Sequence, residues 1–423
     1  MDKLRNFLKK HRMLPDDIIP SELAGEMAED MRRGLRGEKS SMAMIPTYVK
    51  AGLPVPRYKP AAVLDAGGTN FRSALVTFTE DGYNTEYLRK VKMPGTDSPA
   101  TWDEFISFTA DQLMPFIDKT DYIGFCFSYF AKITPEIDGI VARMDKEVVI
   151  KGCVGKSIAK SLNDELERRG KSRKKIAVIN DTLAVLLGGS SVLDASKYSG
   201  FAAQVSGTGT NTCCAVPIGE ITKLGIPGTD RIIVNNESGL YDGIPFGDFD
   251  EELDRDSLKP GESRFEKLTA GLYLGNLSIL MLKGALKEGL LSAETGRKLE
   301  KFDSIDSSWP DVWSRGEKLD TVCAEEDREF VSGICRALFH RSAACMCTNI
   351  AAMLLLTGEG KNKDKPVCIC AEGSLVQKSR VYREKLEELI ETEINGRMGL
   401  NAVLRPVEES TLPGAAAAVL TNL

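Results

Sequence analysis

Two glycine-rich turns, separated by about 140 residues, are the first candidates for chemistry in this sequence. Each follows an apolar stretch, carries Gly, Thr and Asn, and leads into another apolar stretch: "LDAGGTNFRSALV" at residues 64–76 and "QVSGTGTNTCC" at residues 204–214. Such turns either bend the chain tightly or let backbone N–H groups approach an anion. Two of them facing each other across a cleft could hold a polyphosphate from both sides. Two unrelated tight turns are the alternative.

A carboxylate directly after an apolar run is a second candidate. Asp181 lies in "KIAVINDT", where the run ends and polar residues begin. A carboxylate in such a place can accept a proton as a general base. It can equally cap the helix that follows, a position that Asp favours. The residue types alone leave both roles open.

Histidine and cysteine chemistry is disfavoured. The two histidines, His11 and His340, are not near a glycine-rich nucleophile motif, and hydrolases of that kind need a positioned imidazole. The ten cysteines include adjacent and alternating pairs without any C-x2-C spacing, and most lie in apolar stretches. We expect buried, reduced thiols rather than disulfides or metal ligands.

Composition and charge exclude several classes of protein. The 423 residues are 42% apolar and 27% charged, with 55 Lys and Arg against 61 Asp and Glu, for a net charge of −6. These values are typical of a soluble protein of two or more domains and argue against non-specific binding to nucleic acid or anionic membranes. No continuous apolar run reaches the ~18 residues that span a bilayer. The charged N-terminus "MDKLRNFLKKHRM" lacks a signal-peptide core, so we expect a cytoplasmic protein.

The elements that position these groups follow from the periodicity. Residues 1–45 are typical of helices, with Ser21 as a candidate N-cap, and a Pro-rich joint "IPTYVKAGLPVPRYKP" follows. Apolar runs predict strands at 61–65, 71–78, 85–93, 122–130, 175–180, 200–206, 210–218, 231–235 and 365–374. Helices are predicted at 157–170, as a crossover, and at 383–394. Two α/β halves that each open with a similar hairpin suggest an internal duplication.

Several segments, in order along almost the whole chain, resemble the hexokinase family of ATP-dependent hexose 6-phosphotransferases. They are "MIPTYV", "LDAGGTNFR", "FCFSYF", "VINDT", "SGTGTNTCC", "VNNESG", "PGESRFEKLTAGLYLG", "AEGSLV" and "LPGAAAAV". The resemblance implies an α/β protein with the duplicated ribonuclease-H-like (actin-like) fold and two lobes around a central cleft. We expect an N-terminal helical segment, 1–60, packing on the large lobe. The small lobe would comprise 61–187 with the C-terminal helix 412–423, and the large lobe 188–411.

On the nucleotide side, the resemblance implies two turns that donate to the phosphates of ATP and a segment near the nucleoside. The residues are Gly67, Gly68, Thr69 and Asn70 on one side, Gly207, Thr208 and Gly209 on the other, and Gly373 and Ser374 near the nucleoside. Arg72 would add positive charge. Asp65 would lie near Mg²⁺ and hold it through water, because this ion gives up its hydration reluctantly. The charge of the predicted site residues is mostly acidic, so magnesium must do much of the neutralising, and we expect Mg-ATP as the donor.

On the sugar side, the resemblance favours Asp181 as the base that accepts the proton of the sugar 6-hydroxyl. The residues matched to hydrogen bonds with the other hydroxyls are Asn180, Asn211, Glu237 and Glu266, with Ser128 and Lys146 from the opposing lobe. Taken alone, Glu266 in "SRFEKLTAG" would instead be assigned to a solvated helix face. Neither nucleic acid nor a membrane is expected as a partner.

Most departures from the family pattern fall on the sugar side. The usual Phe-Ser-Phe-Pro becomes "FSYF", with Tyr129 and Phe130 in place of Phe and Pro. Asp145 replaces a threonine that contacts sugar in the family, beside the retained Lys146, and an ionised Asp cannot donate as threonine does. Tryptophan is replaced by Ser238, and a lysine near the last motif by Pro413.

The resulting hypothesis is a sugar kinase that makes hexose 6-phosphate, acting on glucose first and also on mannose or fructose. A sugar- or nucleotide-binding regulator on the same fold, with weak or no turnover, is the alternative, but such a sensor has no need of a base at Asp181. An actin-like ATPase does not account for the polar residues matched to sugar. We also expect the lobes to close on sugar, with joints near 183–200 and Leu412, which would exclude water.

Overall fold

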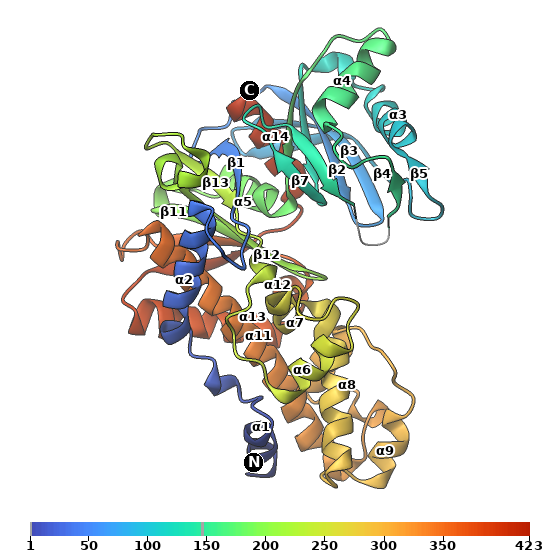
Figure 1. Cartoon of the computed structure of the whole chain (residues 1–423), viewed down its shortest axis with the longest axis vertical. Coiled ribbons are helices and arrows are strands. Elements are labelled where there is room, and N and C mark those ends of the chain that lie inside the picture. Colours follow the sequence, from blue (N-terminus) through green and yellow to red (C-terminus); the bar gives the residue numbers. More distant parts are fainter. Residues whose placement is uncertain (1, 145–147) are drawn as a thin grey trace. The chain divides into compact units, whose positions relative to one another are not determined.

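The computed structural model describes residues 2–144 and 148–423, and its contacts divide the chain into two units (Figure 1). Unit 1 comprises residues 1–43, 204–212 and 236–406, and unit 2 comprises 44–203, 213–235 and 407–423. The predicted small lobe, 61–187 with 412–423, falls within unit 2, which also takes in 44–60, 188–203 and 213–235. The predicted lobe boundaries themselves stay a prediction.

The first glycine-rich turn joins two strands of a five-stranded sheet in unit 2. The strands are β2 (Pro60–Gly67), β3 (Asn70–Thr79), β4 (Gly82–Lys92), β6 (Tyr122–Phe127) and β10 (Lys175–Ile179), in the order β10-β6-β2-β3-β4. Neighbours pair antiparallel from β2 to β4 and parallel from β2 to β10. The parallel pairs place the ends of β2, β6 and β10 at one edge, where polar residues follow each strand.

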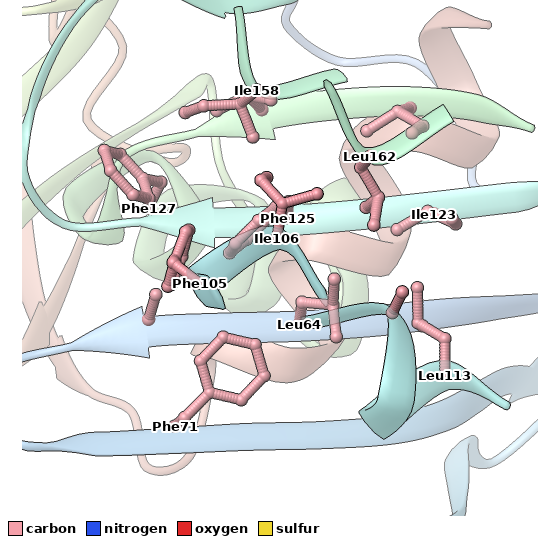
Figure 2. Close-up of a cluster of buried hydrophobic side chains, with 14 of the residues drawn as sticks. Leu64, Phe71, Phe105, Ile106, Leu113, Ile123, Phe125, Phe127, Ile158 and Leu162 are labelled. Carbon is pink, nitrogen blue, oxygen red and sulfur yellow. The ribbon is translucent and has the colours of Figure 1, made fainter. Parts of the chain in front are cut away.

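One face of this sheet carries α3 (Trp102–Leu113) and α4 (Ile158–Arg168), whose side chains form the core shown in Figure 2. Thr101 caps α3 in a capping box with Glu104, and Ser157 caps α4. Helix α4 lies in the chain between the parallel strands β6 and β10, which confirms the predicted crossover helix. Core residues labelled in Figure 2 are Leu64, Phe71, Phe105, Ile106, Leu113, Ile123, Phe125, Phe127, Ile158 and Leu162.

Two apolar helices, α5 (Asp181–Val192) and α14 (Thr411–Asn422), pack on each other in unit 2, and α14 also contacts β2, β6 and β10. Glycines allow the close approach: a Cβ on Gly414 would lie 1.9 Å from the carbonyl oxygen of Ala184, and one on Gly124 would lie 2.0 Å from that of Ala415. Pro413 lies in the first turn of α14, where proline needs no hydrogen-bond partner for its nitrogen.

The remaining strands of unit 2 include one that the sequence analysis assigned to a Pro-rich joint. Strand β1 (Ile45–Lys50) pairs antiparallel with β13 (Arg231–Asn235), which pairs in turn with β12 (Thr210–Pro217). Thr47 Oγ1 donates to the Ile233 carbonyl, a partner far along the chain that local sequence could not reveal. Short pairs join β7 (Phe130–Ile133) to β8 (Gly139–Arg143) and β5 (Ala100–Thr101) to β9 (Ile150–Lys151). The boundary between the two units falls within strand β11 (Gly200–Ser206), after residue 203.

Unit 1 is built around the 30-residue helix α11 (Arg328–Thr357), which packs against several helices of the same unit. Residues 325–357 are long and apolar enough to span a membrane by length and composition, but 89% of the most apolar window is buried in the protein. The residues of this helix do not form one continuous apolar run in the sequence, because the polar residues His340, Arg341 and Asn349 interrupt it. Its surroundings are those of a core helix.

The other elements of unit 1 complete its core. They are the parallel pair β14 (Val367–Glu372) and β15 (Ala402–Pro406), with α1 (Asp2–Lys10), α2 (Pro20–Arg36), α6 (Asp248–Arg255), α7 (Arg264–Thr269), α8 (Gly271–Lys287), α9 (Ala293–Leu299), α10 (Ser308–Ser314), α12 (Ser374–Lys378) and α13 (Arg380–Leu389). A π-helix, Ile390–Arg397, continues α13.

The N-cap of α2 differs from the prediction, and the cysteines agree with it. Ser21 is not the N-cap of α2: Ile19 holds that position, Pro20 starts the helix, and the Ser21 hydroxyl donates to Glu393 at 2.7 Å. The cysteine prediction is confirmed, since all ten are free and buried.

Candidate functional site

The first glycine-rich turn is a two-residue hairpin loop. Gly67 pairs with Asn70, leaving Gly68 and Thr69 between the strands. Gly68 has φ 58°, and a positive φ at this first loop position is what a type II′ turn requires. The Thr69 carbonyl accepts from the Met93 amide at 2.9 Å. The turn is therefore tied to the strand end beside it.

Asp65 and Arg72 form a largely buried ion pair directly beside this turn. They are register partners on β2 and β3, and the Asp65 Oδ2 atom lies 2.7 Å from Arg72 Nε and 2.6 Å from Arg72 Nη2. Burial raises the pKa of Asp65 above its usual range, while Arg72 opposes this shift and the charge of Asp181 adds to it. The structure thus brings the predicted metal-side carboxylate and the predicted phosphate-side cation into contact.

Ser128 follows β6 at the same edge of the sheet. Its amide donates to the Ala66 carbonyl at 3.1 Å, and its Oγ atom lies 3.9 Å from Cys126 Sγ. A Cβ on Gly67 would lie 3.5 Å from both Ser128 Oγ and Asp65 Oδ1. Position 67 therefore lies in van der Waals reach of both polar side chains, which brings Asp65 and Ser128 together beside the turn.

Asp181 is the first residue of α5, and Asn180 is its N-cap. The Thr182 amide donates to both Asn180 Oδ1, at 2.8 Å, and Asp181 Oδ1, at 2.7 Å. Among residues 2–144 and 148–423, no donor bonds to Asp181 Oδ2. The charge of Asp181 contributes to the raised pKa values of Asp65 and Cys126, after burial as the main cause.

The part of the chain that departs from the family's sugar motifs starts within the described residues, but its later residues lie outside them. Phe130 starts β7 opposite Arg143 on β8, and the Arg143 guanidinium lies 4.6 Å from the centre of the Phe130 ring. Phenylalanine can keep a backbone N–H at this position, where the proline usual in the family has none. Asp145 and Lys146 lie outside the described residues.

The second glycine-rich turn lies in unit 1 and is surrounded by backbone. The Gly207 amide donates to the Gly209 carbonyl at 3.0 Å, and the Gly271 amide, at the start of α8, donates to the Gly207 carbonyl at 2.7 Å. A Cβ on Gly373 would lie 2.3 Å from the Ser206 carbonyl oxygen, and one on Gly207 would lie 3.4 Å from the Ser374 amide. The predicted phosphate turn and the predicted nucleoside segment are therefore in contact, with Thr208 exposed between Gly207 and Gly209.

Three predicted sugar-side residues also meet in unit 1. Glu266 is half-buried and its Oε2 atom accepts from the Thr210 amide at 3.2 Å, so the solvated-face alternative for Glu266 is wrong. Asn211 Oδ1 accepts from the Ser238 amide at 3.3 Å, which places it beside Glu237. Glu237 has φ 55°, a strained conformation for a residue with a side chain and one that is typical of functional sites.

A buried polar network that the sequence analysis missed supports this cluster. Asn236 Nδ2 donates to Thr212 Oγ1 at 3.0 Å, and Thr212 Oγ1 donates to Asn349 Oδ1 at the same distance. All three residues are fully buried. The amide of Asn349 in an otherwise apolar stretch of α11 was the available signal, but its partner Thr212 lies 137 residues away along the chain.

The predicted site residues thus fall into two sets, one in each unit. Unit 2 brings together Asp65, Gly67, Gly68, Thr69, Asn70, Arg72, Ser128, Asn180 and Asp181, and unit 1 holds Gly207, Thr208, Gly209, Asn211, Glu237, Glu266, Gly373 and Ser374. Among the described residues, no group of three or more His, Cys, Asp or Glu could hold a metal ion directly. Asp65, with Oδ2 on Arg72 and Oδ1 beside Gly67, fits Mg²⁺ held through water rather than by a protein cage.

Comparison with known proteins decides the family. Two family models described as hexokinase match residues 3–191 and 201–421, and the second alone covers more than half of the chain. The chain belongs to the hexokinase family. Hexokinase-7 of Oryza sativa subsp. japonica is 30% identical over 92% of this chain and 89% of its own length. Hexokinase-2, chloroplastic, of Nicotiana tabacum is 29% identical over 95% and 86%.

The solved structures of hexokinases establish the fold. The hexokinase of Schistosoma mansoni complexed with glucose superposes with a TM-score of 0.79 at 22% identity, covering 99% of both chains. Another hexokinase structure gives 0.84 at 19% identity over the whole of both chains. The expected duplicated actin-like fold is confirmed, and membership of the hexokinase family makes this chain a hexose kinase that transfers a phosphoryl group to a sugar hydroxyl.

Proposed function

We propose that this hexokinase family member transfers the γ-phosphate of Mg-ATP to the 6-hydroxyl of glucose, with mannose and fructose as further acceptors. The observation that carries the proposal is the state of Asp181. Its Oδ1 atom accepts from Thr182, while Oδ2 accepts no hydrogen bond from any described residue. A carboxylate with one oxygen anchored and one open is suited to take a proton from an alcohol as its oxygen attacks phosphorus.

The nucleotide side of the proposal rests on the two turns. Their amides, with Arg72, would hold the phosphates, and Gly373 and Ser374 would lie near the nucleoside. Magnesium would be held through water near Asp65 and would neutralise charge on the phosphates. Asp181 lies in the first turn of α5, where the positive end of the helix dipole favours a carboxylate.

The preferred sugar depends on the residues that depart from the family pattern. Asp145 stands where the family has threonine, and an ionised Asp can accept but not donate, so any sugar hydroxyl that bonds to it would have to act as the donor. A buried polar site discriminates strongly against sugars that leave its groups unpaired. We propose glucose as the first acceptor, the sugar in the complex of the Schistosoma mansoni hexokinase, and expect the ranking of sugars to report on Asp145.

The test is a coupled assay of ADP release with glucose, mannose, fructose, glucosamine and no sugar. The Asp181→Asn variant keeps an oxygen that can accept from Thr182 but removes the base, so kcat should fall at least 100-fold while the protein stays folded. Asp194→Asn is the matched control, because Asp194 also accepts from a backbone amide, at 3.1 Å from Ser196, but is exposed at a surface turn. Equal activity in wild type and Asp181→Asn would contradict the assignment.

The alternative, a regulator with weak or no turnover, predicts a different result in the same assay. Calorimetry would detect sugar or nucleotide binding, but no sugar would stimulate ADP release. The cytoplasmic location also stays a proposal, since relatives include a chloroplastic hexokinase, and cell fractionation would test it.

A further inference from the structure

Tyr129 departs from the family's sugar motif, yet its hydroxyl contacts the first phosphate turn. The side chain is 5% exposed and its ring packs on Phe127, with ring centres 5.2 Å apart. The hydroxyl donates to the Gly68 carbonyl at 2.9 Å. Both residues belong to unit 2.

This bond completes the anchoring of the turn's two carbonyl groups. The Gly68 oxygen accepts from Tyr129, and the Thr69 oxygen accepts from the Met93 amide. The peptide between Gly68 and Thr69 is trans, so the Thr69 N–H points opposite to the Gly68 carbonyl and away from Tyr129. A Cβ on Gly68 would meet no described atom within 4 Å beyond its chain neighbours, so there is open space beside this residue of the turn.

The alternative orientation of this peptide would be unfavourable for an anion. Rotating the Gly68–Thr69 peptide would turn a carbonyl oxygen toward the side where the Thr69 N–H now points. It would also convert the turn toward type I′, which requires a positive φ at Thr69, a β-branched residue. Tyr129 opposes this rotation by holding the oxygen.

We propose that Tyr129 is a positioning residue: its hydroxyl holds the Gly67–Asn70 turn in the conformation that presents the Thr69 amide to the terminal phosphates of the nucleotide. This inference rests on the proposed function, which places the phosphates at that turn. Tyr129, which lies in the segment matched to the family's sugar motif, thereby affects the phosphate site by holding the backbone of the turn. Its ring alone would fill the core, as phenylalanine does in the family, so the hydroxyl is the group to test.

The test compares Tyr129→Phe with Tyr122→Phe, a matched loss of a hydroxyl at the opposite end of β6. Tyr122 accepts from Lys59 at 2.6 Å and, among the described residues, makes no hydrogen bond to the turn. Calorimetry would measure affinity for the magnesium complex of a non-hydrolysable ATP analogue, for adenosine and for glucose, and steady-state assays would give KM for ATP and kcat. Thermal denaturation would report whether each variant remains folded.

Loss of one hydrogen bond predicts that Tyr129→Phe binds the ATP analogue about three- to tenfold more weakly, with adenosine and glucose affinity unchanged. KM for ATP should rise more than kcat falls, and Tyr122→Phe should match wild type. Unchanged affinity for the analogue would overturn the inference, as would equal losses for analogue and adenosine, or a loss for glucose instead.

The outcomes also separate this inference from the proposed function. A wild type that binds the analogue but phosphorylates no sugar overturns the function, while the binding comparison still decides the role of Tyr129. A wild type that binds no ATP analogue overturns both.

Discussion

Among single residues, the Asp65–Arg72 ion pair makes the stability of the protein depend on pH. Asp65 is 7% exposed, and burial raises its pKa despite Arg72. An acid whose pKa is raised on folding loses stability as the pH rises from about 4, its unfolded pKa, through the folded value. Replacing Arg72 by Met removes the opposing charge and extends that loss to higher pH. We expect Arg72→Met to lower the free energy of unfolding by about 3 kcal/mol at pH 7.5 and by clearly less at pH 5.

Chemical denaturation at the two pH values would measure this loss. Arg57→Met is the matched control, because Arg57 pairs with Glu80 at the surface of the same unit and should matter little. The double variant Arg72→Met with Asp65→Asn should recover part of the loss, since no buried charge remains. Equal losses at both pH values would show that Arg72 stabilises by packing rather than by compensating Asp65.

At the scale of elements, the close packing of α5 and α14 positions Asp181. Intrinsic helix propensity favours Ala over Gly by about 1 kcal/mol, yet a Cβ on Gly414 would lie 1.9 Å from the Ala184 carbonyl oxygen. We therefore expect Gly414→Ala to destabilise by about 3 kcal/mol. It should also lower activity, since Asp181 starts the helix that would have to move.

The control for this prediction is another helical glycine. Gly25 in α2 is exposed, and a Cβ there would meet no described atom within 4 Å, so Gly25→Ala should stabilise by up to about 1 kcal/mol. Denaturation curves and the ADP assay on both variants would check the pair. Similar effects of the two substitutions would mean that α5 and α14 have room to separate.

At the scale of the whole molecule, we predict that sugar binding closes the two lobes. The chain passes between the units at 43–44, 203–204, 212–213, 235–236 and 406–407, whereas the predicted joint at 183–200 includes α5 residues of unit 2. Closure would exclude water that competes with the sugar for the phosphoryl group. Small-angle scattering should show a smaller radius of gyration with glucose than with an equal concentration of sucrose. No change with any hexose would rule out the clamp.

Local sequence was sufficient to predict a strand or the start of a helix where an apolar run ended in glycine-rich turn residues or in a helix-capping residue. The runs on either side of Gly67–Asn70 and of Gly207–Gly209 became strands as predicted, because each is a short, mostly buried apolar run that meets a glycine-rich turn. The same holds for Asp181, which follows a buried strand and starts a helix. These features depend on neighbours within a few residues, so periodicity and turn chemistry could specify them.

Other features depended on partners distant in the chain, and only the tertiary structure decided them. Strand β1 forms because residues 45–50 meet β13, about 185 residues away. Glu266 accepts from a backbone amide 56 residues distant instead of facing solvent. The Tyr129 hydroxyl reaches Gly68 across 61 residues. A hydrogen bond needs its donor and acceptor within about 3 Å, and no local pattern states which distant group will be there.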